Sequence, residues 1–570
     1  MKPDATYKGW MMTLRSITDA SRATTLRMVV LRLITLIACT AITLSLSACT
    51  SDEGTDKQSS GTASSSNQTV GSVAVFTPSD GVTISGNTPL NKWTKFVPAL
   101  TDALREEGFA KKHITTSSAD SLDKQSRDIQ DYVVNHVSAA NSSSTDGTAA
   151  NSADDVTLIV APVTSADDTT RQYGDYVSTT ITTATSDANN STSSDNATSD
   201  EHQALERLTS ALTLAQENGM HVIMLASTIT GFQPNAYVRM STAEMIGTIQ
   251  ALKLVNKLAL DTVSKDNPKN IEVLVPYTPK SSANSGVGAV LGLSSADDDD
   301  ESADPTEEGA QFAQEVFAGA WSVLQPYFKS GKAVSSSGLL TADTTADDWR
   351  SVAFACTKQE DAGVVLRKRL AMTSRDDTHT RIDGIIAMND YTAAGVVKEL
   401  ADLGYTGSAA DINPSITISG IVENITGKKD LQRSKVPDPI KAPETDTETS
   451  KDSSTDNSDA DSTVEQTNAR WPIVTGYGAY VDVMPQIVAG QQWMTATEDR
   501  ASLAKDTAQA CRLLNAGTAL TSSTLSALSS SKVNGKDTST ISEDLLAVSA
   551  YNLKAALIDP GYITLAEAGL

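Results

Sequence analysis

From residue 72 onward, short apolar runs alternate with longer stretches in which apolar residues recur every three or four positions. The short runs are typical of strands buried on both faces, and the longer stretches have the periodicity of amphipathic helices. Strands are predicted over 73–78, 156–163, 221–227, 270–277 and 333–338, and helices over 93–108, 125–137, 205–219, 242–260, 311–328 and 347–372. Strands that alternate with helices of this length indicate βαβ units, so the predicted fold class is α/β with parallel sheets.

The stretch 381–407 is the clearest of these units. Ile382, Ile385 and Ile386 predict a buried strand, and an amphipathic helix follows and ends near Gly404. The pair Asn389-Asp390 lies between the two, where an open α/β sheet presents groups to a ligand. Asn and Asp are also ordinary caps of a following helix, so the pair has two interpretations, ligand contact and helix cap.

Four polar insertions separate the predicted elements: 138–155, 186–200, 294–306 and 441–468. They consist mainly of Ser, Thr, Asp, Asn and Glu and lack the apolar residues that a core needs, so we predict disordered surface loops. The acidic run 297–301 lacks the alternating Asp and the Gly of a calcium loop and is interpreted as a solvated loop.

The first 48 residues predict an export signal. A basic segment precedes the apolar stretch 33–46, which is short for a bilayer span, and Leu46-Ser47-Ala48-Cys49 resembles the bacterial lipobox. We therefore expect cleavage before Cys49 and lipid attachment to it, with a single N-terminal membrane helix as the alternative. Residues 49–71, mostly Ser, Thr, Gly, Asp and Gln, predict a flexible tether. Together these segments predict an extracytoplasmic protein anchored to the cell membrane by lipid.

Composition excludes some functions. The chain has 45 Lys and Arg against 70 Asp and Glu, a formal net charge of −25, which argues against nucleic acid as a partner. The five histidines have no metal-ligand spacing, and no nucleophile elbow, zinc-protease or phosphate-binding-loop motif is present. We therefore predict no enzyme activity, no catalytic residue, no metal and no cofactor. A hydrolase would need a pair of suitably spaced carboxylates, which a sequence cannot show.

Several motifs together resemble one family. They are 385–407, with IIAMNDYTAAGVVKELADLGYTG; 317–338, with FAGAWSVLQPYFKSGKAVSSSG; 471–499, with WPIVTGYGAYVDVMPQIVAGQQWMTATED; and 551–570, with YNLKAALIDPGYITLAEAGL. With LNKWTKF near the front, they are similar to the type I periplasmic binding proteins of sugar ABC transporters, in particular the xylose-binding and multiple-sugar-binding receptors. The match runs from about Ser72 to Leu570 and is interrupted by the insertions.

The resemblance implies two Rossmann-like lobes joined by a three-crossing hinge, with ligand in the cleft between them. It implies a first lobe over 72–260 with a return segment at 499–517, a second lobe over 261–495, and a closing segment over 518–570. Cys511 then falls in the first lobe and Cys356 in the second. Because a disulfide needs Cα atoms within about 7 Å, we expect two free, buried thiols.

The resemblance also implies ligand-binding positions, several of which depart from the family pattern. Asn389 and Asp390 match, Lys92 replaces an arginine, and Trp93 offers a stacking surface. Ser227 follows Ala226 where relatives carry Asp-Arg, and Tyr477 lies beside Gly478, which replaces an acid. A core position is the alternative interpretation for Trp93. The expected pocket is therefore non-standard for a sugar.

We expect a monomeric, lipid-anchored receptor that binds a small molecule, a carbohydrate by class, and delivers it to ABC permease subunits. Closure of the lobes around the ligand would create the surface that the permease recognises. The alternative is a surface sensor, scaffold or adhesion lipoprotein with the same fold that transports nothing.

Overall fold

The computed structural model describes residues 70–80, 89–143, 155–164, 168–182, 195–280, 304–410 and 464–570. The predicted signal segment, Cys49 and the acidic run 297–301 lie outside these residues. In the described part of the chain, no helix combines the length and the apolar composition that a bilayer span requires.

The first sheet has seven strands in the order β15-β16-β7-β5-β3-β1-β2. Their bounds are β1 Ser72–Pro78, β2 Ile114–Ala119, β3 Val156–Val160, β5 His221–Leu225, β7 Ala236–Val238, β15 Leu528–Val533 and β16 Lys536–Ile541. Neighbouring strands are parallel, apart from the antiparallel hairpin β15–β16. The sheet is therefore assembled from both ends of the chain.

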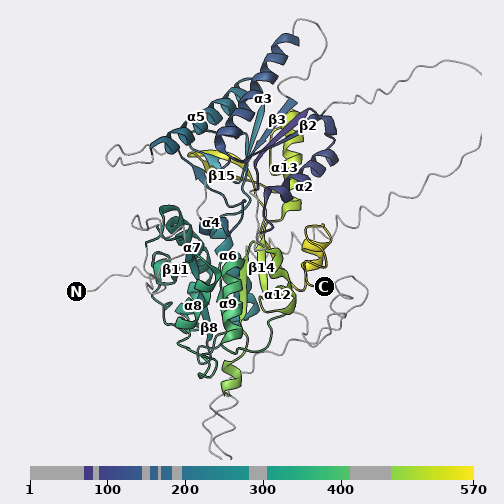
Figure 1. Ribbon diagram of the computed structural model, residues 1–570. Helices are drawn as coiled ribbons and strands as arrows, with labels where there is room; N and C mark the ends of the chain where they lie inside the picture. The colour runs from purple at the N-terminus through teal and green to yellow at the C-terminus, as the bar shows by residue number, and fades with distance from the viewer. Residues whose placement is uncertain are drawn as a thin grey trace, which may run out of the picture. The chain divides into compact units, whose positions relative to one another are not determined.

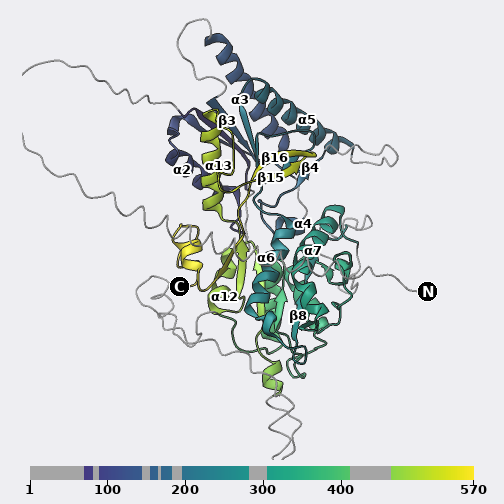
Figure 2. The same cartoon turned by 180° about the vertical axis from the view of Figure 1, so that it is seen from behind.

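Helices cover both faces of this sheet, which explains the uninterrupted apolar runs. Val73 and Val75 of β1 pack with α2 (Trp93–Glu106) and α13 (Arg500–Asn515), whereas Ala74 and Phe76 pack with α3 (Leu122–Ser143) and α5 (Asp195–Glu217). Figures 1 and 2 show the α3–α5 pair and the α2–α13 pair on opposite faces.

The second sheet has six strands in the order β10-β8-β12-β13-β14-β17, all parallel except β17. Their bounds are β8 Lys269–Val273, β10 Ala333–Val334, β12 Gly384–Ile386, β13 Ile473–Tyr477, β14 Met494–Thr497 and β17 Leu546–Ser549. One apolar cluster joins its strands to α6 (Ala243–Lys257) and α7 (Glu307–Lys329), and another joins them to α8 (Gln359–Arg369) and α9 (Asp390–Asp402). The predicted α/β fold with two lobes of parallel-dominated sheets is confirmed.

Smaller elements complete the described fold. Two short pairs are parallel: β9 (Val275–Tyr277) with β11 (Ala353–Ala355), and β4 (Thr180–Ile181) with β6 (Thr228–Ile229). The remaining α-helices with given bounds are α4 (Asp168–Arg171) and α12 (Met484–Ala489).

Within the described residues, successive elements connect the two sheets in three places: β7 to α6, β14 to α13, and β16 to β17. These are the three predicted crossings. The predicted boundary at residue 260 differs from the contacts, because α6 lies before it and packs on the second sheet. The predicted closing segment 518–570 likewise divides, since β15 and β16 join the first sheet and β17 joins the second.

Some predicted elements were wrong in detail. A single helix over 347–372 is replaced by a 3₁₀ turn, the strand β11 and the helix α8. Three of the predicted insertions are helical where the structure describes helix in them: α3 continues to Ser143, α5 begins at Asp195, and residues 464–468 are helical. The expectation for the cysteines is confirmed: Cys356 and Cys511 are free and buried, and burial raises the pKa of both thiols.

Candidate functional site

Side chains that follow the strands of both sheets meet at one place, which we call the junction. Asn91 precedes α2 on the first sheet, Ser241 lies between β7 and α6, and Asn389, Tyr477 and Tyr480 follow β12 and β13 of the second. The carboxyl ends of parallel strands are where open α/β sheets bind ligands. The junction is therefore the expected place for a ligand between the lobes.

The chain itself occupies the junction. Residues 169–178, which run from α4 toward β4, lie among these side chains, and Tyr173 and Tyr176 have no exposed surface. We call residues 169–178 the junction segment.

The junction segment contacts the second lobe through polar and aromatic groups. Asn389 Nδ2 donates to Gln172 Oε1 at 3.2 Å, and the Tyr480 hydroxyl donates to the Gln172 carbonyl at 2.6 Å. The Tyr173 ring packs against Phe312 of α7 with centroids 4.4 Å apart. These contacts place Gln172 and Tyr173 where a ligand of the second lobe would lie.

The same segment is fixed to the first lobe by its other end. Lys92 Nζ lies 2.9 Å from Asp175 Oδ1, and the Tyr176 hydroxyl donates to the Lys92 carbonyl. The Tyr176 ring packs edge-on against Trp93 at 5.1 Å and against Phe96 at 6.1 Å. Burial raises the pKa of Asp175 to about 6 although Lys92 lies beside it.

Gly174 permits this close fit. Its φ is +84°, which L side chains rarely adopt, and a Cβ there would lie 1.9 Å from Asn91 Oδ1. Asn91 uses its Nδ2 to donate to the Tyr173 carbonyl at 2.6 Å, while its Oδ1 is buried without a hydrogen-bond partner. A buried acceptor without a partner lowers stability, so the close packing of the segment against Asn91 costs free energy.

Asn389 caps a helix, as one of its two interpretations had it, and ligand contact stays a prediction. Its Oδ1 accepts from Thr392 N at 2.8 Å and caps α9, while its Nδ2 points to Gln172. Helix capping therefore uses one end of the amide and leaves the other for the junction.

Asp390, next to it, is turned into the second lobe and is fully buried. Its carboxylate accepts from Tyr480 N at 2.9 Å, Gln492 Nε2 at 2.7 Å and Thr495 Oγ1 at 2.8 Å. Burial raises the pKa of Asp390 to about 6 in spite of these donors. Asp390 therefore holds the β13–Tyr480 backbone in place, and through Tyr480 it positions Gln172.

The other predicted site residues are also engaged within the chain. Trp93 is 3% exposed and packs in the core of the first lobe, as the alternative interpretation had it, and Lys92 pairs with Asp175. Ser227 Oγ lies 2.9 Å from Thr179 Oγ1. Tyr477 is fully buried, and its hydroxyl donates to Glu498 and lies 3.1 Å from Ser241 Oγ. Ligand contact by these residues stays a prediction.

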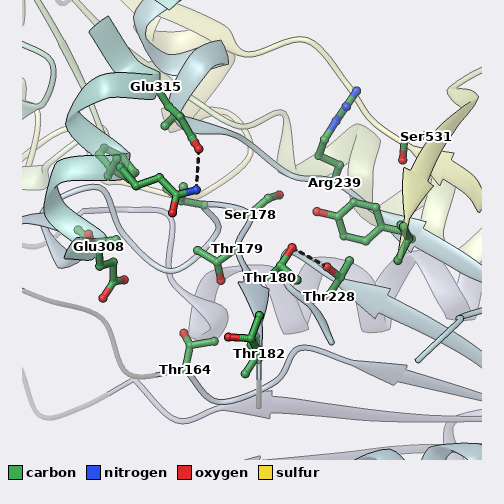
Figure 3. Close-up of a pocket in the computed structure, with 18 of the residues that line it drawn as sticks. Thr164, Ser178, Thr179, Thr180, Thr182, Thr228, Arg239, Glu308, Glu315 and Ser531 are labelled. Carbon is green, nitrogen blue, oxygen red and sulfur yellow. Dashed lines mark hydrogen bonds between the residues drawn. The ribbon is translucent and has the colours of Figure 1, made fainter. Parts of the chain in front are cut away.

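A cavity of about 960 Å³ lies beside the junction segment. Figure 3 shows one wall carrying hydroxyl groups, including the pair Thr180–Thr228 with oxygens 3.1 Å apart. Gln311 and Glu315 of α7 line the cavity too, as do Arg239 and Phe312, the residue that packs on Tyr173. A polar cavity thus adjoins the closed junction.

Sequence reasoning missed the junction segment. Thr-Thr-Arg-Gln-Tyr-Gly-Asp-Tyr-Val-Ser has no strand or long-helix periodicity, and two of its partners are distant in sequence: Asn91 lies 82 residues before Tyr173, and Asn389 lies 217 residues after Gln172. The one available signal was its pair of tyrosines, Tyr173 and Tyr176, which interrupt a polar stretch.

Comparisons with known proteins gave structural likenesses alone. No family model matches the chain, and no curated protein matches it. Among solved structures, an ABC transporter solute-binding protein from Clostridium phytofermentans with bound β-D-glucose is 18% identical, with a TM-score of 0.42, over 87% of this chain and 99% of that one.

Two further solved structures are of the same kind. A carbohydrate transporter solute-binding protein from Chloroflexus aurantiacus in complex with D-glucose is 17% identical, with a TM-score of 0.42, over 87% of this chain and 97% of that one. An ABC transporter periplasmic solute-binding protein from Actinobacillus succinogenes with bound D-allose is 10% identical, with a TM-score of 0.37, over 85% and 100%. These three structures are thus solute-binding proteins of transporters, each with a bound sugar. At these TM-scores we draw no conclusion from them about its ligand.

Proposed function

We propose that this chain is an extracytoplasmic, lipid-anchored solute-binding receptor of an ABC importer, and that its ligand is a carbohydrate bound at the junction. The observation that carries the proposal is the convergence of Asn91, Asn389 and Tyr480, from the strand ends of two parallel sheets, on one place. Three connections between the sheets are suited to a hinge that opens and closes that place.

The chemistry of the junction suits a neutral polyhydroxylated ligand. Asn91 and Asn389 offer amide groups, Tyr480 offers a hydroxyl, and the rings of Phe312 and Tyr477 lie close by. Hydroxyl groups of a sugar exchange hydrogen bonds with amides, and its C–H faces pack on aromatic rings. The lipid anchor and the permease rest on the lipobox-like Leu46–Cys49 segment and on the resemblance of the four motifs.

Screening by thermal unfolding against mono- and oligosaccharides, nucleosides and peptides tests this function, followed by calorimetry on every hit. A ligand at about 100 times its Kd adds about 2.7 kcal/mol to the free energy of unfolding, which such a screen detects. Binding of a carbohydrate, with uptake of the same compound lost when the gene is deleted, is the expected result. Silence across the carbohydrates would refute the assignment.

A second function is favoured by one observation, the closed state of the junction. Tyr173 and Tyr176 are fully buried there, and Lys92 and Asp175 are paired. A sensor, scaffold or adhesion lipoprotein with a permanently filled junction has no need of a ligand there. Deletion that leaves carbohydrate uptake unchanged but alters adhesion or signalling would favour it, as would a gene neighbourhood without a permease and an ATPase.

A further inference from the structure

The junction segment presents to the second lobe the kind of surface that a sugar ring presents. Gln172 supplies two acceptor oxygens at its edge, one for Asn389 Nδ2 at 3.2 Å and one for the Tyr480 hydroxyl at 2.6 Å. The adjacent Tyr173 ring supplies an apolar face, 4.4 Å from Phe312 and 6.1 Å from Tyr477 between centroids. A polar edge beside an apolar face is also what a pyranose offers to its binding site.

The two halves of the segment are attached differently. Asp175 and Tyr176 bind the first lobe through an ion pair, a hydrogen bond and ring packing against Trp93 and Phe96. Gln172 and Tyr173 contact the second lobe through two hydrogen bonds and ring packing. Thr169 N also donates to Thr278 Oγ1 of the second lobe at 2.7 Å, so separation of the lobes can break the contacts of residues 169–173 while residues 174–178 stay on the first lobe.

The segment also carries a cost where it meets the first lobe. Asn91 Oδ1 is buried without a partner, and Gly174 is pressed against it in a left-handed conformation. Beside the segment, the cavity of about 960 Å³ reaches Phe312, the residue on which Tyr173 packs. Phe312 therefore contacts both the cavity and Tyr173 of the junction segment.

We propose that residues 169–178 are a built-in substitute for the ligand, which holds the lobes together when no carbohydrate is bound and which a carbohydrate displaces from Asn389, Tyr480 and Phe312. Gln172 and Tyr173 then set the affinity and the selectivity of the receptor, because a ligand must exchange its own contacts for theirs. This proposal rests on the proposed function, and it adds that residues 169–178 compete with the carbohydrate for the same contacts.

Gln172→Ala tests the proposal most directly. It removes the acceptor for Asn389 and leaves the carbonyl bond of Tyr480 in place. Because the closed state is weakened by about one hydrogen bond, we expect carbohydrate to bind about three- to tenfold more tightly in calorimetry. Gln216→Ala is the matched control, since Gln216 donates to Gln233 O and Asn235 Oδ1 on the far part of the first lobe. This control should bind as the wild type does.

Gly174→Ala is the second variant, because it keeps both contacting side chains and forces the backbone beside Tyr173 away from Asn91. We expect affinity to rise here too, since a shifted backbone no longer holds Gln172 and Tyr173 against Asn389, Tyr480 and Phe312. Hydrogen exchange of the wild type should show faster exchange of amides 169–173 when carbohydrate is added, whereas amides 174–178 stay protected.

The outcomes separate the two proposals. If wild type, Gln172→Ala and Gly174→Ala bind one carbohydrate with equal Kd, or if amides 169–173 become more protected on binding, the receptor function stands and the substitute is refuted. If none of the three binds any carbohydrate, both are refuted. If the affinity rises in both variants and not in Gln216→Ala, the substitute is established.

Discussion

The junction and the cavity beside it are both polar, and both lie between strand ends of the first sheet and elements of the second, yet one is full and the other is open. At the junction Asn91, Asn389 and Tyr480 donate hydrogen bonds to residues 169–178, and Tyr173 has no exposed surface. In the cavity the hydroxyls of Thr180 and Thr228 pair with each other and face about 960 Å³ of space. Polar residues at strand ends thus form a place suited to a ligand, and other segments of the chain determine whether that place is occupied or open.

Loss of the Tyr173 ring should lower the stability of the protein most. Tyr173→Ala removes a fully buried aromatic side chain that packs on Phe312, and we expect the free energy of unfolding to fall by about 3–5 kcal/mol. Urea denaturation measures the change. A loss below about 1 kcal/mol would mean that the junction is loosely filled, and the contrast with the cavity would disappear.

The protonation of Asp390 should make the stability of the protein depend on pH. Its pKa is raised from 3.8 to about 6 by burial, so the folded state takes up a proton that the unfolded state releases between about pH 4 and 6. The contribution of Asp390 to stability is therefore full below pH 4 and is lost as the pH rises through 6. Relative to Asp390→Asn, the wild type should gain about 3 kcal/mol between pH 7 and pH 4. Urea denaturation at each pH checks this, and parallel curves would contradict it.

A smaller effect is expected for the direct contact between Gln172 and Asn389. A double-mutant cycle with Gln172→Ala and Asn389→Ala should give a coupling of about 0.5–1.5 kcal/mol, the usual worth of one hydrogen bond. Unfolding of the two single variants and the double variant supplies the measurement. If the effects simply add, the closed junction does not depend on this bond.

The smallest effect belongs to the cavity wall. Thr182 is exposed and lines the cavity, so Thr182→Ala should change the free energy of unfolding by less than about 0.5 kcal/mol. Thermal unfolding checks it. A loss like that of Tyr173→Ala would show that the cavity wall supports the junction.

The sequence predicted the strands well where both faces of a sheet are covered, because a run such as Val73–Phe76 has no other way to bury every side chain. It failed at β11, where Ala353, Phe354 and Ala355 also fit the helical periodicity around them. Three residues are too few for periodicity to distinguish a strand from a helix, and the pairing with β9 decides.

The candidate site was predictable in part for a similar reason. Asn389 was predicted because its position directly after a buried strand can be recognised from the neighbouring residues. The role of Gln172 was not found, because it depends on Asn389, 217 residues away. The support that Asp390 gives to the second lobe was not found either, since its three donors come from residues 480–495.

The way in which the first sheet is assembled has a consequence for how the chain is made. Its strand β16 pairs with β7 about 300 residues earlier, and α13 covers the face formed by Val73 and Val75. During synthesis, the first strands therefore emerge long before the helix that shields them and the strand that extends their sheet. The amino-terminal half stays without these partners until synthesis is nearly complete, so folding of the first lobe cannot finish while the chain is still growing.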